Sequence, residues 1–248
     1  LFDQNAPLGH IIRTLKGHTD VIRCMILLVA EEDQSFGNGR HKDSRAVAAA
    51  YKDFLLTCSD DKTIRLWNLN TGVQVKQYMG HTQCVNFICK IISSTHEDNK
   101  NDDDTVFSLL FASASDDKSI KIWHVNNEEA LHTIENAHST FIWSLIYSKS
   151  AHVLISSSAD VQIKIWKITV EKSKSSVKCQ HTLVHAIKNP FGWDCYRMVF
   201  LNKFGMDGTL LLVGDFDGNM FIVNIVNGIV VRKYKKAHFR SLQNFAVA

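Results

Sequence analysis

Short runs that alternate between apolar and polar residues recur along the chain, and turn-forming residues separate them. In Thr63-Ile-Arg-Leu-Trp-Asn68 the alternation puts Ile64 and Leu66 on one face, as in a half-buried β-strand. The preceding Asp60-Asp61-Lys62 is typical of a turn, because an Asp side chain can bond the backbone nearby. An apolar run, Phe54–Cys58, comes before that turn. The pattern therefore predicts two antiparallel strands joined by a tight turn.

This two-strand pattern occurs four times and aligns without gaps. The four copies are Thr57-Cys-Ser-Asp-Asp-Lys-Thr-Ile-Arg-Leu-Trp67, Ser113-Ala-Ser-Asp-Asp-Lys-Ser-Ile-Lys-Ile-Trp123, Ser156-Ser-Ser-Ala-Asp-Val-Gln-Ile-Lys-Ile-Trp166 and Val213-Gly-Asp-Phe-Asp-Gly-Asn-Met-Phe-Ile-Val223. The second and third copies are about 40–45 residues apart, the spacing of a four-stranded blade repeat. The wider spacings require insertions.

Each copy is flanked by two further predicted strands. The apolar strands expected before the copies are Val21–Val29, Val85–Ile92, Phe141–Tyr147 and Cys195–Leu201, and the shorter strands expected after them are Val73–Tyr78, Ala130–Ile134, Lys178–Val184 and Ile229–Tyr234. The result is an all-β chain with four antiparallel strands in each of four units. One such sheet cannot bury both apolar faces alone, so we expect the units to stack radially.

The repeats resemble those of the WD-repeat (β-transducin-like) β-propeller family. Residues Gly17-His18 and Gly80-His81 match the Gly-His dipeptide of that family, and Ala137-His138 and Ala237-His238 are variants of it. Leu66-Trp67-Asn68 and Ile122-Trp123-His124 match its strand-ending Trp-Asp, with the Asp replaced. The fourth copy is degenerate, with valines at positions 213 and 223. The resemblance implies a β-propeller segment of four four-stranded antiparallel blades, with partial blades at both ends.

The expected organisation treats residues 1–248 as one WD-repeat section of a larger propeller. Its parts are the end of a preceding blade at 8–18, blades at 19–78, 82–135 and 139–184, a degenerate blade at 192–234, and the start of a further blade at 239–248. Three polar insertions are expected to be loops: Glu31–Asp53, Ser93–Thr105 and Val170–Gln180.

Composition supports an ordinary folded protein. The 248 residues include 45% hydrophobic residues and only 2 prolines, which excludes a mainly disordered or collagen-like chain. The net charge of +3 is too small to indicate a nucleic-acid protein by itself. No apolar run is long enough to cross a bilayer, and the 6 cysteines form no Cys-x-x-Cys pair. We therefore expect an intracellular protein of the cytoplasm or nucleus, without a membrane partner.

His, Ser or Thr, Asp and Trp recur together in three of the units. The sets are His18, Thr57, Asp61 and Trp67; His81, Ser113, Asp117 and Trp123; and His138, Ser156, Asp160 and Trp166. By residue type each resembles a hydrolase triad, but a catalytic site occurs once and no Gly-x-Ser-x-Gly motif is present. The family resemblance implies a structural chain of hydrogen bonds from indole to hydroxyl, imidazole and carboxylate. In the fourth unit, Asp217 and His185 are expected to have lost two partners of this chain.

Neither a metal nor a cofactor is expected. The 12 histidines follow the turns and show no metal-ligand spacing. Gly214-Asp-Phe-Asp-Gly218 is glycine-containing, but its two carboxylates would repel a phosphate. We therefore predict no catalytic residue, no metal site and no nucleotide site.

The resemblance also implies that partners dock on the face formed by the Gly-His turns and the turns after each second strand. Carried over by position, the candidates are Asp20, Asp60, Gln83, Asp116, Thr140, Ala159 and Phe216. Phe216 stands where two sister repeats have Asp, so we take it as the best single contact residue. Phe141 and Trp193 are nearby aromatics that could anchor a peptide, whereas we expect Trp143 to pack inward.

The predicted function is a non-catalytic protein–protein interaction scaffold that assembles a multiprotein complex. Family roles of this kind include substrate recognition for a ubiquitin ligase and signalling scaffolds. The alternatives are an RNA-associated propeller of a nuclear RNA-processing complex, which would use Arg232–Arg240 and the Lys172–Lys178 loop, and a hydrolase. We favour a solvated outer strand for Arg232–Arg240, so nucleic acid is not the preferred partner.

Overall fold

The computed structural model describes residues 13–28, 53–91, 110–172, 177–201 and 208–237. Within these ranges every regular element is a β-strand, and no helix is long and apolar enough to cross a membrane. The prediction of an all-β chain is confirmed. Several predicted segments lie outside the described residues. They are the start of a blade at 239–248, His238, the Ser93–Thr105 insertion, and the Glu31–Asp53 insertion except for Asp53.

Within the described ranges, sixteen strands form four antiparallel four-stranded sheets, numbered one to four in chain order. Sheet one contains β1 (Ile22–Leu27), β2 (Phe54–Ser59), β3 (Ile64–Asn68) and β4 (Gln74–Tyr78). Sheet two contains β5 (Val85–Ile91), β6 (Leu110–Ser115), β7 (Ile120–His124) and β8 (His132–Ile134). Sheet three contains β9 (Ile142–Ser148), β10 (Val153–Ser158), β11 (Gln162–Lys172) and β12 (Val177–Lys188). Sheet four contains β13 (Cys195–Phe200), β14 (Leu210–Asp215), β15 (Met220–Asn224) and β16 (Ile229–Tyr234).

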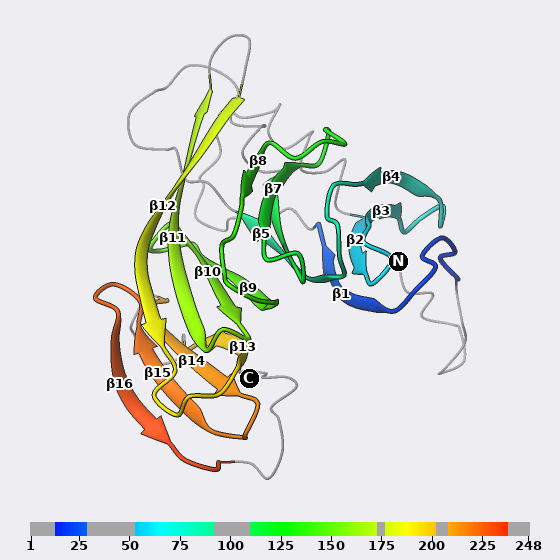
Figure 1. The fold of residues 1–248 in the computed structure, drawn as a ribbon. Coiled ribbons are helices and arrows are strands. Elements are labelled where there is room, and N and C mark those ends of the chain that lie inside the picture. Colours follow the sequence, from blue (N-terminus) through cyan, green and yellow to red (C-terminus); the bar gives the residue numbers. More distant parts are fainter. Residues whose placement is uncertain (1–12, 29–52, 92–109, 173–176, 202–207, 238–248) are drawn as a thin grey trace, which may run out of the picture.

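The sheets stack side by side around their first strands. In each sheet the strand order follows the chain, and the first strands β1, β5, β9 and β13 contact one another in that sequence. Figure 1 shows these strands toward the middle of the molecule, with the last strands β4, β8, β12 and β16 on the outside. This is the arrangement of propeller blades, as the resemblance to the WD-repeat family implied.

Apolar side chains fill the space between neighbouring sheets. Between sheets one and two, Leu66 packs in the same core cluster as Phe111 and Trp123, and the rings of Phe111 and Trp123 stack with centroids 6.1 Å apart. Similar clusters join sheet two to sheet three and sheet three to sheet four. Sheets two and three therefore bury both faces against neighbours, and sheets one and four bury one face each.

The turn between the second and third strands has the same backbone in all four sheets. Its left-handed residue is Lys62, Lys118, Val161 or Gly218, with φ of 70°, 71°, 61° and 80°. Glycine adopts this region at no steric cost, whereas Val161 is β-branched and is strained there. The repeat thus imposes one turn geometry even where the residue disfavours it.

One prediction about local structure is wrong. The Val170–Gln180 insertion is not a loop throughout, because β11 and β12 extend into it as a long hairpin (Figure 1). Cys179 is buried and Val170 packs beside it, while Glu171 lies opposite Lys178, so the segment has both an apolar face and opposite charges at facing positions. The end of a preceding blade predicted at 8–18 is described only from residue 13 onward.

Candidate functional site

The four residues of each predicted set of His, Ser or Thr, Asp and Trp are joined by hydrogen bonds. In sheet two, the Trp123 indole nitrogen lies 2.8 Å from the Ser113 hydroxyl, and that hydroxyl lies 2.7 Å from His81 Nε2. His81 Nδ1 lies 2.8 Å from an Asp117 carboxylate oxygen. The corresponding residues are Trp67, Thr57, His18 and Asp61 in sheet one and Trp166, Ser156, His138 and Asp160 in sheet three. We call each of these chains a relay.

The ionised carboxylate at the end of a relay sets the direction of its bonds. The pKa of Asp117 is lowered, so its carboxylate is ionised and accepts, and His81 Nδ1 carries the hydrogen that is donated to it. Burial disfavours the charged imidazole, so His81 Nε2 accepts from the Ser113 hydroxyl, whose oxygen accepts from the Trp123 indole N–H. A neutral imidazole beside an ionised carboxylate thus satisfies every group in the chain.

Burial and hydrogen bonding set these charge states. Burial lowers the pKa of the His81 and His138 imidazoles, although the neighbouring Asp opposes the change in each. Burial alone would raise the pKa of the Asp61 carboxyl, but bonds from Thr63 and His18 outweigh it and lower that pKa to about 2. The pKa of Asp117 is lowered in the same way, with His81 as the main donor.

Each relay ties the turn that enters a sheet to the strands inside that sheet. The histidine lies before the first strand, the hydroxyl is on the second, the carboxylate follows it in the turn, and the Trp is on the third. In sheet one the glycine before the histidine lets this turn approach the Trp, since a Cβ at Gly17 would lie 2.7 Å from the Trp67 ring. The relays are therefore buried cross-links within the first three blades.

Sheet four replaces the relay with a different polar cluster. Asp215 is fully buried, and its carboxylate accepts bonds from the Asn189 and Asn219 side-chain amides and from the Asp217 backbone N–H. The backbone N–H of Asn189 donates to the backbone carbonyl of Val161. In the same way, the backbone N–H of His138, the relay histidine of sheet three, donates to the backbone carbonyl of Lys118.

Asn189, and not His185, therefore holds the position of the relay histidine in sheet four. The expectation for His185 is wrong: this residue bonds the Val226 carbonyl at 3.1 Å. The repeat pattern missed the new cluster because Asn189 matches neither Gly-His nor its Ala-His variant.

The turns and the entries of the first strands meet on one face of the molecule. In every sheet a backbone N–H of the turn after the second strand donates to the carbonyl of the residue just before the first strand. These pairs are Asp60 with Val21, Asp116 with Cys84, Ala159 with Phe141, and Phe216 with Asp194. We call the surface formed by these eight residues and the residues beside them the turn face.

A β-bulge near the start of each first strand adds a side chain to the turn face. The register with the second strand shifts there in all four sheets, and the unpaired residues are Arg23, Asn86, Trp143 and Tyr196. A bulge redirects the extra side chain, which is how these four leave the packed faces of the sheets. Trp143 is half-buried, with its indole nitrogen buried and its ring in contact with Phe141 and Tyr196.

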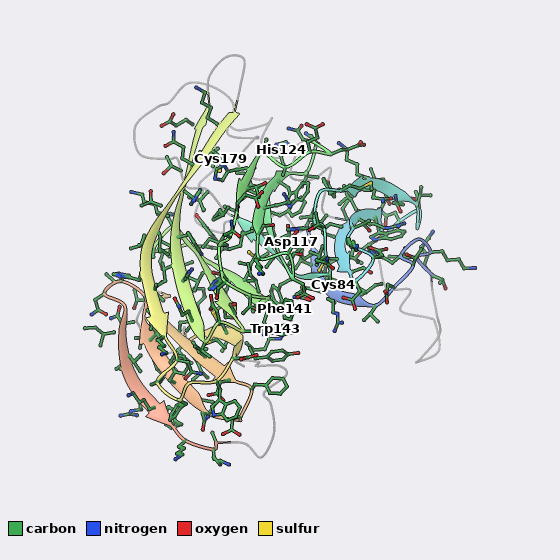
Figure 2. The ribbon with its side chains drawn as sticks, viewed as in Figure 1. Cys84, Asp117, His124, Phe141, Trp143 and Cys179 are labelled. Atoms are coloured by element: carbon green, nitrogen blue, oxygen red, sulfur yellow. The ribbon has the colours of Figure 1, made fainter. Side chains whose placement is uncertain are left out.

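The turn-face residues of sheets three and four form a line of aromatic contacts. Phe141 lies edge-on to Trp143 at 6.0 Å, Trp143 lies 5.6 Å from Tyr196, and Tyr196 lies edge-on to Phe216 at 5.9 Å between ring centroids. Phe141 and Phe216 are 44% and 54% exposed. We call these four residues the aromatic ladder; Figure 2 shows Phe141 and Trp143 together, far from His124 and Cys179 at the other end of the blades.

The turn-face residues of sheets one and two are polar. Arg23 forms a bidentate pair with Asp60, with N–O distances of 2.7 and 2.5 Å. The Asn86 amide donates to Asp116 at 2.6 Å. Burial and the charges of Asp60 and Asp116 raise the pKa of the Cys84 thiol, which shows how closely the two carboxylates flank it.

The structure brings the predicted partner-binding residues onto this one face. Asp60, Asp116, Ala159 and Phe216 occupy equivalent turn positions, while Asp20, Gln83 and Thr140 precede the first strands. Trp193 holds the fourth of those positions and is 49% exposed. Sequence reasoning missed Arg23, Asn86 and Tyr196, because nothing in a single sequence marks which strand residue is bulged.

Among the described residues, no three His, Cys, Asp or Glu side chains gather as metal ligands would. The turn face carries aromatic rings, a guanidinium and carboxylates, which are groups that bind other molecules through non-covalent contacts. The relay hydroxyls lie beneath it, and the Ser113 and Ser156 side chains belong to residues with no exposed surface.

Comparison with known proteins finds one matching family. A family model described as "WD domain, G-beta repeat" matches residues 41–68, 72–124 and 128–167. "Nuclear distribution protein PAC1" of Arthroderma otae is 28% identical over 172 residues, which are 68% of this chain and 32% of that protein. "Nuclear distribution protein nudF" of Aspergillus terreus is 31% identical over 129 residues, or 52% of this chain and 26% of that protein.

A third similar protein is "Lissencephaly-1 homolog 1" of Paramecium tetraurelia, 32% identical over 90 residues, or 36% of this chain and 19% of that protein. The chain thus matches about a third or less of the length of each of these relatives.

Proposed function

Because the chain belongs to the WD-repeat family, we propose that it is a non-catalytic scaffold whose turn face binds partner proteins in a multiprotein complex. The relays hold the first three blades rigid, the Asp215 cluster takes their place in the fourth, and the turn face presents side chains from all four blades at once. Contact area across blades, and not bond-making chemistry, provides the specificity.

One observation carries this proposal: four bulges direct one side chain from each blade to the same face. A bulge in a single strand would be a local irregularity, but four at equivalent positions build a common surface. Large aromatics that stay half exposed, such as Phe216 and Trp193, are the residue types that dominate protein interfaces. The turn face is therefore suited to bind a protein.

The burial of the relays supports a non-catalytic role. A nucleophilic serine must reach a substrate, whereas Ser113 and Ser156 are fully buried and their oxygens already accept from an indole N–H. The same arrangement occurs three times at equivalent positions. The relatives are named for nuclear distribution, which is a cellular process and not a reaction.

The other roles considered have less support. The names of the relatives point neither to ubiquitin ligation nor to RNA processing. The basic residues Arg232, Lys233, Lys235 and Lys236 are exposed on or just after β16, the outermost strand of sheet four. Most of them are thus on the outer edge of the sheet, although the Lys236 backbone N–H bonds the Asn219 side chain in the turn after Phe216. All six cysteines are free thiols, which supports a place inside the cell.

Affinity capture from a cell extract, with the proteins quantified by mass spectrometry, tests this function. We expect the wild-type chain to capture a defined set of proteins, and the double variant Phe216→Ala/Trp193→Ala to lose most of that set. Ile229→Ala is the matched control, because Ile229 is equally exposed (58%) but lies on β16. If the face variant and the control both captured the wild-type set, the turn face would not be the binding surface.

A further inference from the structure

The turn face is divided into an aromatic and an acidic half that meet at Asn86. The Asn86 amide donates to Asp116 in sheet two and also to the carbonyl of Ile142 at 3.0 Å. Ile142 lies between Phe141 and Trp143, the first two residues of the aromatic ladder. The Asp116 carboxylate is therefore two hydrogen bonds away from the backbone that carries the ladder.

A second carboxylate belongs to Asp194 in sheet four. The Asp194 backbone carbonyl accepts the backbone N–H of Phe216, which joins this residue to the turn that carries the last ring of the ladder. Burial raises the pKa of Asp194, and the Trp143 indole N–H opposes that rise. Carboxylates from sheets two and four therefore accompany the aromatic ladder.

The carboxylates of the acidic half are crowded. Burial raises the pKa of Asp116, the Asn86 bond opposes this, and the charge of Asp60 adds to the rise. Asp60 is already matched by Arg23, and the exposed Asp20 lies beside this pair. A cation brought in by a partner would relieve the repulsion at Asp116.

One ladder ring, that of Tyr196, already binds a cation from within the chain. The Arg197 guanidinium lies 4.7 Å from the Tyr196 ring centroid and 5.3 Å from that of Phe87 in sheet two, and it donates to the Trp143 carbonyl. Ring faces attract cations, and the exposed rings of Phe141 and Phe216 offer the same surface to a partner. Aromatic rings accompanied by carboxylates favour a ligand that is apolar and positively charged.

We propose that the turn face binds a linear segment of a partner protein in which a large apolar side chain lies next to Lys or Arg. The apolar side chain packs against Phe141 and Phe216, and the cation lies at Asp116 or Asp194. This inference rests on the proposed function and names the chemistry of the partner. An acidic peptide or a nucleic-acid backbone would meet the carboxylates with like charge and is disfavoured.

Selection of a random peptide library on the immobilised chain tests this inference. We expect enriched peptides to combine a large apolar residue with a neighbouring Lys or Arg. One enriched peptide is then synthesised with a fluorescent label and titrated. Phe216→Ala should weaken its binding by about tenfold, the loss typical of an aromatic anchor. Asp116→Asn keeps the size of the side chain and its acceptor for Asn86, and it should weaken binding less but reduce the salt dependence.

The controls separate this inference from the proposed function. Glu129→Gln removes an exposed charge from the turn between β7 and β8 and should leave the titration unchanged. Enrichment of acidic peptides, an absence of enrichment, or unchanged binding in both face variants would overturn the inference. Labelled polyuridylate that bound the wild type but not Phe216→Ala would do the same. Loss of captured proteins in Phe216→Ala/Trp193→Ala would still support the proposed function after any of these results.

Discussion

His81 Nδ1 lies 2.8 Å from a carboxylate oxygen of Asp117, and this bond sets the protonation of the relay in sheet two. The pKa of Asp117 is lowered, so the carboxylate is ionised and accepts, while burial lowers the pKa of His81 and favours the neutral imidazole. His81 Nε2 then accepts from Ser113, whose oxygen accepts from the Trp123 indole N–H. The relays of sheets two and three therefore stabilise their blades in one charge state, neutral His with anionic Asp.

Removal of a relay residue should destabilise the chain more than removal of its counterpart in sheet four. Trp67→Ala leaves a large cavity and should cost about 3–5 kcal/mol. Asp61→Ala leaves His18 and the Thr19 N–H without an acceptor and should cost about 1–3 kcal/mol. Asp217 bonds Asp215 through its backbone N–H, which Asp217→Ala retains. Chemical denaturation of the three variants measures the difference, and equal losses would argue against the relay.

Acidification should destabilise the fold before the carboxylates titrate. The pKa values of His81 and His138 are lowered by burial, so the unfolded chain binds protons at these residues at a higher pH than the folded chain does. The free energy of unfolding should therefore fall as the pH drops below about 6.5, the ordinary value for His. The lowered pKa of Asp61 adds a further loss only below about pH 4.

Urea denaturation between pH 8 and pH 5 checks this pH dependence. His81→Gln/His138→Gln is the matched comparison, since glutamine does not titrate and should flatten the profile. A wild-type stability that stayed constant down to pH 5 would contradict the neutral-histidine assignment.

Asp215 should be as important to sheet four as a relay is to the other sheets. Its buried carboxylate accepts from Asn189 and Asn219, so Asp215→Ala leaves two amides without their acceptor. We expect a loss of about 2–3 kcal/mol, against a small change for Asp217→Ala two residues away. Thermal unfolding of both variants tests this, and similar midpoints for the two would show that the cluster does not stabilise the sheet.

Val161→Gly should stabilise the chain. Val161 has φ of 61° at the turn position where sheet four has Gly218, and a β-branched residue is strained there. Relief of that strain should gain about 1 kcal/mol, after the greater freedom of glycine in the unfolded chain is counted. Lys62→Gly is the control, because the unbranched Lys62 tolerates its φ of 70° better and should gain less. A destabilised Val161→Gly would mean that the side chain contributes more than the strain costs.

The strands and relays could be predicted because their residues recur at the same spacing in several repeats of the sequence. Alternation identified the hairpins, and the constant spacing of Asp61 and Trp67 from Thr57 recurred in two later units. The bulges could not be predicted, since Trp143 and Tyr196 differ in type from Arg23 and Asn86 and share only a backbone position. The hairpin at Val170–Gln180 was not predicted, because the lysines in this segment indicated a polar loop and the cross-strand pairing of Val170 with Cys179 cannot be seen in the sequence.

Our account assigns stability to the relays and binding to the turn face, and the most direct test measures both quantities in Phe216→Ala. The wild-type chain and this variant are titrated with one protein from the affinity capture, and their thermal unfolding midpoints are recorded. We predict a Kd about tenfold higher for the variant with an unchanged midpoint, because Phe216 is more than half exposed. An unchanged Kd would contradict the account, as would a Kd that rises only together with a lower midpoint.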